Sequence, residues 1–336
     1  MPMVIQPLGK ESVDSEISCV SSNIDGTYIA WATYKGLLSI KNIQINEIKK
    51  IQLESYATQI GMTSKNNFII GQEEGNLINF SKNCDKLWEL KCPAGCELLK
   101  CSEMGDLIVI IDGTNTLRTI SSKGEVLGIF SEFELIGMSV NKKGSAISCW
   151  DDEGNLFVLN RNCKVIFKRE KNENFGERII TTKFTSNGIL LVSKESLEIP
   201  ESGDQNELEF WNPLGQKIGC VSFNSKCLTL NSNGNIIFAG LFNGEVYSIH
   251  NNNLKLIWKS DYAIKKVIPI NNDILISSWF YLYRINSENG NEIWRVEHEG
   301  IIDHLITTLN KNIVVLAGND RNDYTNAAPL IFIDPH

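Results

Sequence analysis

Hydrophobic and polar residues follow one another in short segments, and the same strand–turn–strand pattern returns eight times along the chain. In each repeat, a short apolar run leads into a polar turn and then into a second run with an apolar anchor. The anchors are Leu37, Leu77, Leu117, Leu156, Leu208, Val246, Leu282 and Leu330, and their spacings are 40, 40, 39, 52, 38, 36 and 48 residues. No segment has helical periodicity, so the pattern predicts an all-β protein.

A repeat of about forty residues made of short strands is typical of a β-propeller, because one four-stranded sheet cannot bury both of its faces alone. The pattern therefore predicts an eight-bladed β-propeller of four-stranded blades, in a single domain of residues 1–336. Seven blades are the alternative, with the eighth unit packed as a distorted cap. The expected repeats are 16–53, 54–91, 92–130, 131–170, 171–221, 222–260, 261–299, and 300–336 together with 1–8.

The two ends of the chain complement each other. The eighth repeat stops at FIDPH, where its fourth strand should begin, and the chain starts with an apolar run at residues 3–8. We expect this N-terminal segment to supply the missing strand and close the ring, which removes an exposed sheet edge. The alternative is that the sequence is the front of a longer protein. Long polar insertions at 194–207 and 319–329 are either binding loops or tolerated surface insertions.

Composition and charge narrow the class of protein. The net charge of −8 and the pI of about 5.2 disfavour nucleic-acid binding, which needs a basic surface. No apolar stretch is long enough to span a membrane, and the start, MPMVIQPLGKE, does not resemble a signal peptide. Most of the nine cysteines lie within apolar strands, as reduced core residues do. We expect a cytoplasmic protein that inserts into no membrane.

The repeats resemble those of quinoprotein-like and WD-repeat-like propellers over essentially the whole chain. WD repeats combine Gly-His with a Trp-Asp pair that ends the third strand, and the chain has no Gly-His. Closer to the quinoprotein-like pattern are GEVYSIHNNNLKLIW (244–258), YLYRINSENGNEIW (281–294), GNLINFSKNCDKLW (75–88) and GNLFVLNRNCKVIF (154–167). The resemblance implies eight blades. Among the roles found in such families, an intracellular interaction platform fits the sequence without conflict.

Candidate catalytic and metal-binding residues are few. Cys92, Cys96 and Cys101 form the densest cysteine cluster, but all four histidines are distant in sequence, so reduced thiols are favoured over zinc. His298 and His304 flank Asp303, yet no nucleophile motif accompanies them. No phosphate-binding or dinucleotide-binding motif occurs. We therefore expect no cofactor, no metal site and no catalytic residue.

The turns between the second and third strands carry acidic and aromatic residues, and in propellers these turns open onto one face. We predict a binding face there for a protein partner with a basic surface, and hence a non-enzymatic interaction platform or scaffold subunit. The alternative is an enzyme or small-ligand sensor that uses the central channel. The predicted binding residues are Tyr34, Glu73, Glu74, Asp112, Trp150, Asp151, Asp152, Glu153, Phe242, Trp279, Phe280, Asp320 and Asp323.

Overall fold

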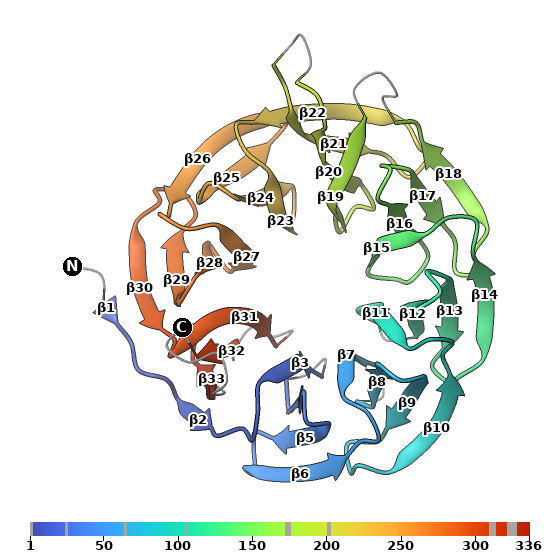
Figure 1. Cartoon of the computed structure of the whole chain (residues 1–336). Coiled ribbons are helices and arrows are strands. Elements are labelled where there is room, and N and C mark those ends of the chain that lie inside the picture. Colours follow the sequence, from blue (N-terminus) through green and yellow to red (C-terminus); the bar gives the residue numbers. More distant parts are fainter. Residues whose placement is uncertain are drawn as a thin grey trace. The chain divides into compact units, whose positions relative to one another are not determined.

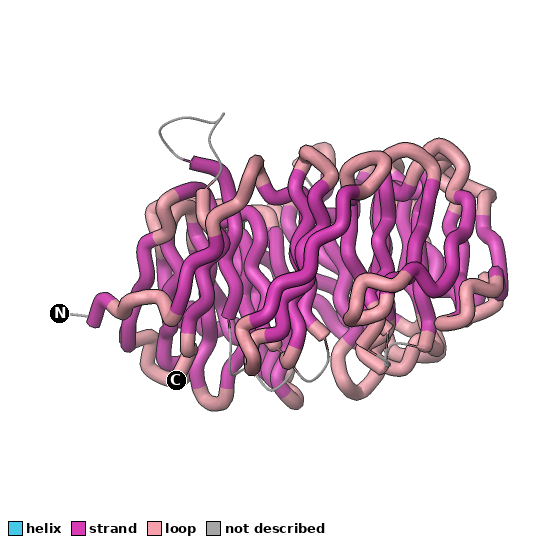
Figure 2. The backbone as a smooth tube through the Cα atoms, turned by 90° about the horizontal axis from the view of Figure 1, so that it is seen from below, coloured by secondary structure: helices cyan, strands magenta, loops and turns pink. Residues whose placement is uncertain are grey.

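The computed structural model describes residues 3–336 except 24–25, 64–65, 105, 172–175, 200–202, 309–313 and 321–327. Strands joined by turns and loops make up these ranges, which contain no helix and hence no helix that could cross a membrane (Figure 2). The strands form eight sheets; apart from two N-terminal strands that join later sheets, strands that follow one another along the chain lie side by side within each sheet (Figure 1). The fold is an eight-bladed β-propeller, as the repeat pattern predicts, and the seven-bladed alternative is wrong.

The described chain divides into two compact units. The first unit comprises Met1–Ile5, Leu135–Asn160 and Lys164–Glu297 and contains the fourth to seventh sheets. Its strands are β15 (Leu135–Val140), β16 (Ile147–Asp151), β17 (Leu156–Leu159) and β18 (Val165–Arg169); β19 (Glu177–Phe184), β20 (Leu190–Ser196), β21 (Asn206–Trp211) and β22 (Lys217–Phe223); β23 (Cys227–Asn233), β24 (Ile236–Leu241), β25 (Glu245–His250) and β26 (Asn253–Lys259); and β27 (Ile264–Ile270), β28 (Asp273–Ser278), β29 (Tyr281–Asn286) and β30 (Glu292–Glu297), beside which β1 (Met3–Val4) pairs in parallel.

The second unit comprises Gln6–Glu134, Arg161–Cys163 and His298–His336 and contains the eighth and the first to third sheets. Its strands are β31 (Gly300–Thr307), β32 (Val314–Asp320), β33 (Leu330–Ile333) and β2 (Gly9–Glu11); β3 (Ile17–Ser22), β4 (Tyr28–Thr33), β5 (Leu37–Asn42) and β6 (Glu47–Gln52); β7 (Ala57–Met62), β8 (Phe68–Gln72), β9 (Asn76–Phe80) and β10 (Lys86–Lys91); and β11 (Cys96–Cys101), β12 (Leu107–Asp112), β13 (Leu117–Ser121) and β14 (Val126–Phe130).

The N-terminal segment supplies the fourth strand of the eighth sheet, as predicted, but with a different part of the segment. Strand β2 pairs antiparallel with β33, so that Gly9 lies opposite Phe332, and the preceding Leu8 donates its N–H to the Phe332 carbonyl at 2.8 Å. The expected strand at residues 3–8 is therefore displaced toward the C-terminus. Pro7 explains part of the displacement, because proline has no N–H to donate to a ladder.

The burial pattern explains why these segments form a propeller. The second strands β12 and β28 are buried at every position, as expected for strands covered on both faces. The fourth strand β10 instead alternates between exposed and partly buried residues, as expected for an outer strand with one solvated face. The difference arises because the second strand lies within its sheet and the fourth lies at its edge.

A β-bulge occurs near the start of the first strand of every sheet. The register with the second strand shifts by one residue at each of these places, for example between Leu135 and Gly137 in the fourth sheet. A bulge bends its strand and redirects nearby side chains. At Gly137 the bulge accommodates Trp150, whose ring atoms would lie 2.1 Å from a Cβ at position 137. The bulges lie at the end of each sheet that also carries the turn between the second and third strands.

Candidate functional site

The predicted binding residues lie where the sequence placed them, in or beside the turns between second and third strands, and both units contain some. The first unit carries Trp150, Asp151, Asp152, Glu153, Phe242, Trp279 and Phe280, and the second carries Tyr34, Glu73, Glu74, Asp112 and Asp320. Asp323 lies outside the described residues. Within each unit, some of these residues are buried in their turns and others are exposed to solvent.

The turn between β16 and β17 separates its acidic residues into two kinds. Asp151 is only 3% exposed; its carboxylate accepts the Asn155 backbone N–H at 2.8 Å and the Asn155 side-chain amide at 2.7 Å. Asp152 and Glu153 follow it and are exposed, and Glu153 lies 3.7 Å from the ammonium group of Lys171. Asp151 therefore shapes the turn, whereas Asp152 and Glu153 face solvent.

The same arrangement recurs in the second unit, in the turn between β12 and β13. The Asp112 carboxylate is fully buried, accepts the N–H groups of Thr114 and Thr116 at 3.0 and 3.2 Å, and pairs with the Arg118 guanidinium at 2.8 Å. Burial alone would raise the pKa of Asp112, but the hydrogen bonds from Thr114 and Arg118 lower it below its usual value. Asp112 therefore stabilises its turn as an ion.

Tyr34 and Tyr56 make an aromatic contact near the predicted binding residues of the second unit. The Tyr34 ring is 50% exposed and lies 5.1 Å from the Tyr56 ring, at a tilt of 51°. A hydrogen bond between the Tyr56 hydroxyl and Glu73 raises the pKa of Tyr56. Glu74, beside Glu73, is exposed. The structure thus brings Tyr34 and Glu73 together through Tyr56.

The first unit carries a larger exposed aromatic group, which we call the aromatic shelf: Phe242, Tyr262, Trp279 and Phe280. Tyr262 and Trp279 stack with centroids 5.1 Å apart, and the Phe280 ring meets Trp279 edge-on at 5.4 Å. Phe242, Tyr262 and Trp279 are 62%, 44% and 40% exposed. Buried area is gained when such rings are covered, so this group of exposed aromatic side chains is a candidate interaction surface.

The backbone holds the shelf in place. Trp279 has a φ of 55°, in the left-handed region that a bulky residue rarely adopts. The Ser278 hydroxyl next to it donates to the Tyr262 carbonyl at 3.1 Å and lies 2.9 Å from the Ser260 hydroxyl. Gly244, at φ 85°, lets the turn that carries Phe242 approach the segment before Tyr262, because a Cβ at position 244 would lie 2.1 Å from the Ser260 carbonyl.

Tyr262 was absent from the sequence-based site, which took its residues from the turns between second and third strands. Tyr262 lies instead in the link between β26 and β27, within KSDYA. Such links open at the same end of the sheet as those turns. An aromatic residue directly after the fourth strand was therefore the available signal for this part of the shelf.

Six charged side chains form a second cluster in the first unit, which we call the charged network: Arg169, Glu177, Lys194, Glu207, Glu209 and Lys217. Arg169 donates Nε to Glu209 Oε2 at 2.6 Å and Nη2 to Glu209 Oε1 at 3.1 Å. Its Nη1 lies 2.7 Å from Glu177 Oε2, as an ion pair without hydrogen-bond alignment.

The lysines complete the network. Lys194 pairs with Glu177 at 2.8 Å and with Glu207 at 2.7 Å, and Lys217 lies 3.1 Å from Glu209. Burial alone would raise the pKa of Glu209, but the guanidinium of Arg169 outweighs it and lowers that pKa to about 2. Three cations balance three anions, so the network is a structural element that joins Arg169 of the fourth sheet to the fifth sheet.

The sequence candidates for chemistry also occupy structural positions. Cys92 and Cys96 are both buried; the Cys92 thiol donates to the Gly95 carbonyl at 3.1 Å and the Cys96 thiol to the Leu98 carbonyl at 3.6 Å. Burial raises the pKa of Cys101 to about 12. His298 is buried; its Nδ1 accepts the Gly300 N–H at 3.0 Å and its Nε2 lies 3.0 Å from the Pro329 carbonyl. Burial lowers the His298 pKa, which favours the neutral ring.

The chain is similar to known proteins in its structure but not in its sequence. No protein-family model matches the chain. No curated protein matches it either. Solved structures that are similar over almost their whole length include the C-terminal WD40 domain of Sif2, with a TM-score of 0.77, 13% identity and 100% of both chains covered. BamB from Moraxella catarrhalis has a TM-score of 0.72 and 13% identity, with 98% of this chain and 99% of BamB covered. Chaetomium thermophilum Sqt1 bound to the N-terminus of the ribosomal protein L10 has a TM-score of 0.77 and 9% identity, with 98% of this chain and 99% of Sqt1 covered. At these identities the likeness shows the propeller fold alone.

Proposed function

We propose that this chain is a non-enzymatic protein-interaction platform, and that its partner binds the aromatic shelf and the acidic turns at the same end of the first unit's sheets. The exposed stacking of Tyr262 on Trp279 carries the proposal. A tryptophan in a left-handed conformation costs stability, and 40% of the Trp279 surface stays exposed in the free chain. Aromatic anchors of this kind contribute much of the binding energy at protein interfaces.

The proposed partner has a basic surface. Asp152 and Glu153 present carboxylates to solvent at this end of the first unit, and the whole chain has a net charge of −8. The faces of tryptophan and tyrosine rings attract cationic side chains. Acidic groups around aromatic anchors also accelerate encounter with a basic partner. The same charge disfavours nucleic acid and anionic membranes as partners.

Two further observations support the proposal. In the solved complex, Sqt1 is a propeller bound to the N-terminus of the ribosomal protein L10. A propeller of this fold can therefore bind a polypeptide segment. No disulfide joins any of the nine cysteines, all of which lie in the described part of the chain, and we propose that the chain acts in the reducing cytoplasm.

Affinity purification from the source cell tests the proposal with three tagged proteins: the unmodified chain, Trp279→Gly combined with Tyr262→Ser, and Leu214→Ser. Glycine at position 279 removes the ring and keeps the left-handed backbone. Leu214 is 81% exposed in the turn between β21 and β22, at the other end of its sheet, and serves as the matched control.

We expect one stoichiometric protein partner with the unmodified chain and with the control. Its recovery from the shelf variant should fall at least about tenfold, since a single anchor residue contributes roughly 2 kcal/mol. Recovery should also fall as salt is raised. Equal recovery of every protein by the shelf variant and the control would exclude the shelf as the binding site.

A further inference from the structure

A cavity of about 310 Å³ lies between the fifth and sixth sheets of the first unit, at the end opposite the aromatic shelf. Its floor is apolar and includes Phe210 of β21, Ile237 of β24 and Ile249 of β25. Phe210 and Ile249 are almost completely buried, while Ile237 is half-buried. The volume is at the lower end of the range of small-molecule sites, which suits one large side chain with its flanking peptide groups.

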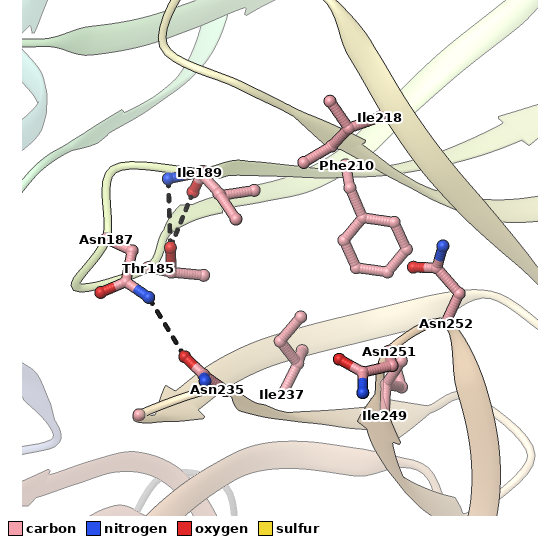
Figure 3. A pocket seen from close by; sticks show the side chains of 11 residues that line it. Thr185, Asn187, Ile189, Phe210, Ile218, Asn235, Ile237, Ile249, Asn251 and Asn252 are labelled. Carbon is pink, nitrogen blue, oxygen red and sulfur yellow. Dashed lines mark hydrogen bonds between the residues drawn. The ribbon is translucent and has the colours of Figure 1, made fainter.

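Asparagine amides form the rim of this cavity. Asn187 and Asn235 belong to the turns between first and second strands of the two sheets, and Asn251 and Asn252 belong to the turn between β25 and β26. Figure 3 shows Asn187 and Asn235 on one side of the space and Asn252 beside Phe210 on the other. We call this cavity with its four asparagines the amide-rimmed pocket.

Hydrogen bonds and backbone geometry keep the pocket open. Asn187 donates its amide to the Asn235 side-chain oxygen at 3.1 Å, which ties the two turns together on that side of the pocket (Figure 3). Asn251 and Asn252 have φ values of 49° and 61°, so their turn is fixed in the left-handed region. In the described part of the chain, the side-chain amides of these two residues make no hydrogen bond. They remain able to bond a ligand.

The lining determines what the pocket can bind. Among the described residues, the lining contains no ionisable side chain, so a charged group placed inside would lose its hydration without gaining a counter-ion. An apolar group gains by covering Phe210 and the isoleucines. Each asparagine offers both an amide donor and a carbonyl acceptor, which is the complement of a peptide group. Floor and rim together match an apolar side chain with the two peptide units that flank it.

We propose that the amide-rimmed pocket is a second binding site, which takes an uncharged peptide segment through one large apolar side chain. The side chain packs on Phe210, Ile237 and Ile249, and the amides of Asn251 and Asn252 bond the peptide groups on either side of it. This site is separate from the aromatic shelf and has the opposite preference, because it excludes basic segments instead of attracting them.

Titration of the ¹⁵N-labelled full chain with capped tripeptides, followed by NMR, tests the proposal. The probes are N-acetyl-Gly-Leu-Gly-amide, its Glu counterpart and maltose. We expect saturable shifts of the asparagine side-chain signals with the leucine peptide, and at least about tenfold weaker binding of the glutamate peptide. Asn251→Gly with Asn252→Gly keeps both left-handed positions and should weaken the leucine peptide about fivefold, since net hydrogen bonds are modest.

Asn46→Gly is the matched control, because Asn46 has a φ of 54° in an exposed turn of the second unit. This control should bind the leucine peptide as the unmodified chain does. Absence of saturable shifts at the solubility limit of the leucine peptide would overturn the proposal. Equal binding of the two peptides, or tighter binding of maltose, would overturn it as well. None of these results depends on the aromatic shelf, so this pocket and the proposed function can fail independently.

Discussion

The charged network and the aromatic shelf lie in the same unit and place their side chains in opposite surroundings. In the network, Arg169 and Glu177 are withdrawn almost completely from solvent, and each charge faces an opposite charge. On the shelf, Phe242, Tyr262 and Trp279 are large and apolar, yet each remains substantially exposed. The charged side chains of the network pair with one another, whereas the aromatic rings of the shelf remain exposed to solvent.

We interpret this difference as one between a structural cluster, the charged network, and a candidate binding surface, the aromatic shelf. A buried charge with a complete set of partners needs no further ligand, and removing one partner is costly. An exposed ring in a strained backbone position is stabilised only when something covers it. Ionisable clusters alone would have directed attention to the charged network, whereas we propose the aromatic shelf as the surface that binds a partner.

Removing one cation from the network should have the largest effect. Arg169→Met leaves Glu177 and Glu209 buried without their shared partner, and we expect the free energy of unfolding to fall by about 3–5 kcal/mol. Urea denaturation measures this loss. Restoring neutrality with Glu209→Gln in the same chain should recover part of it. A loss within about 0.5 kcal/mol for Arg169→Met, as for an ordinary surface residue, would contradict this view of the network.

The network should also make stability depend on pH. Glu209 has a folded-state pKa of about 2, below its ordinary value of 4.5, so it favours the folded state above that ordinary value. This contribution is lost as the pH falls from 4.5 toward 2 and amounts to about 3 kcal/mol. Urea midpoints measured across this range should fall steeply for the unmodified chain and less steeply for Glu209→Gln. Parallel curves would show that Glu209 titrates alike in both states.

The shelf should respond to substitution in the opposite direction. Trp279→Gly relieves a left-handed tryptophan, and we expect the isolated chain to keep its stability or gain up to about 1 kcal/mol. Thermal and urea unfolding measure the change. Trp294 provides the contrast, because its ring is fully buried in β30 and Trp294→Ala should cost roughly 3–5 kcal/mol. A large loss of stability on Trp279→Gly would make the shelf an architectural element like the network.

The exposed acids should have the smallest effect on the fold. Asp152→Lys with Glu153→Lys should change the free energy of unfolding by no more than about 0.5 kcal/mol, because both side chains face solvent. The association rate of a basic partner should fall at low salt, and the difference should vanish at high salt. Stopped-flow association measures this rate. Asp151→Asn is the counterpart that should disturb the turn itself, since Asp151 accepts two hydrogen bonds there.

Local patterns were sufficient for much of this fold. The apolar run that becomes β12 could be recognised from the sequence, because a strand buried on both faces must be continuously apolar. The turn around Asp151 was equally visible, since Asp and Gly favour turns. The position of β2 was harder to predict from the sequence, because its edge pairing at Gly9–Glu11 depends on β33, more than three hundred residues away.

The candidate site was predicted only in part. The positions of Trp279 and Phe242 could be predicted, because both lie in turns between second and third strands. The stacking of Tyr262 on Trp279 could not, because Tyr262 lies in the link between β26 and β27, and Trp279 lies in the turn between β28 and β29. The role of Asp112 was also hidden, because an acidic residue in a turn looks alike in sequence whether it faces solvent or an arginine. Burial decides between these cases, and burial is a property of neighbours.

The sequence by itself determined the period, the eight repeats and the turns, since strand, turn and anchor positions follow from residues close together in the chain. Only the tertiary structure decided which charges are paired, which rings stay exposed and where a cavity remains. Arg169 meets Glu209 across forty positions, and Asn187 meets Asn235 across forty-eight. Such contacts depend on how neighbouring sheets pack, because packing brings together side chains that no local pattern connects.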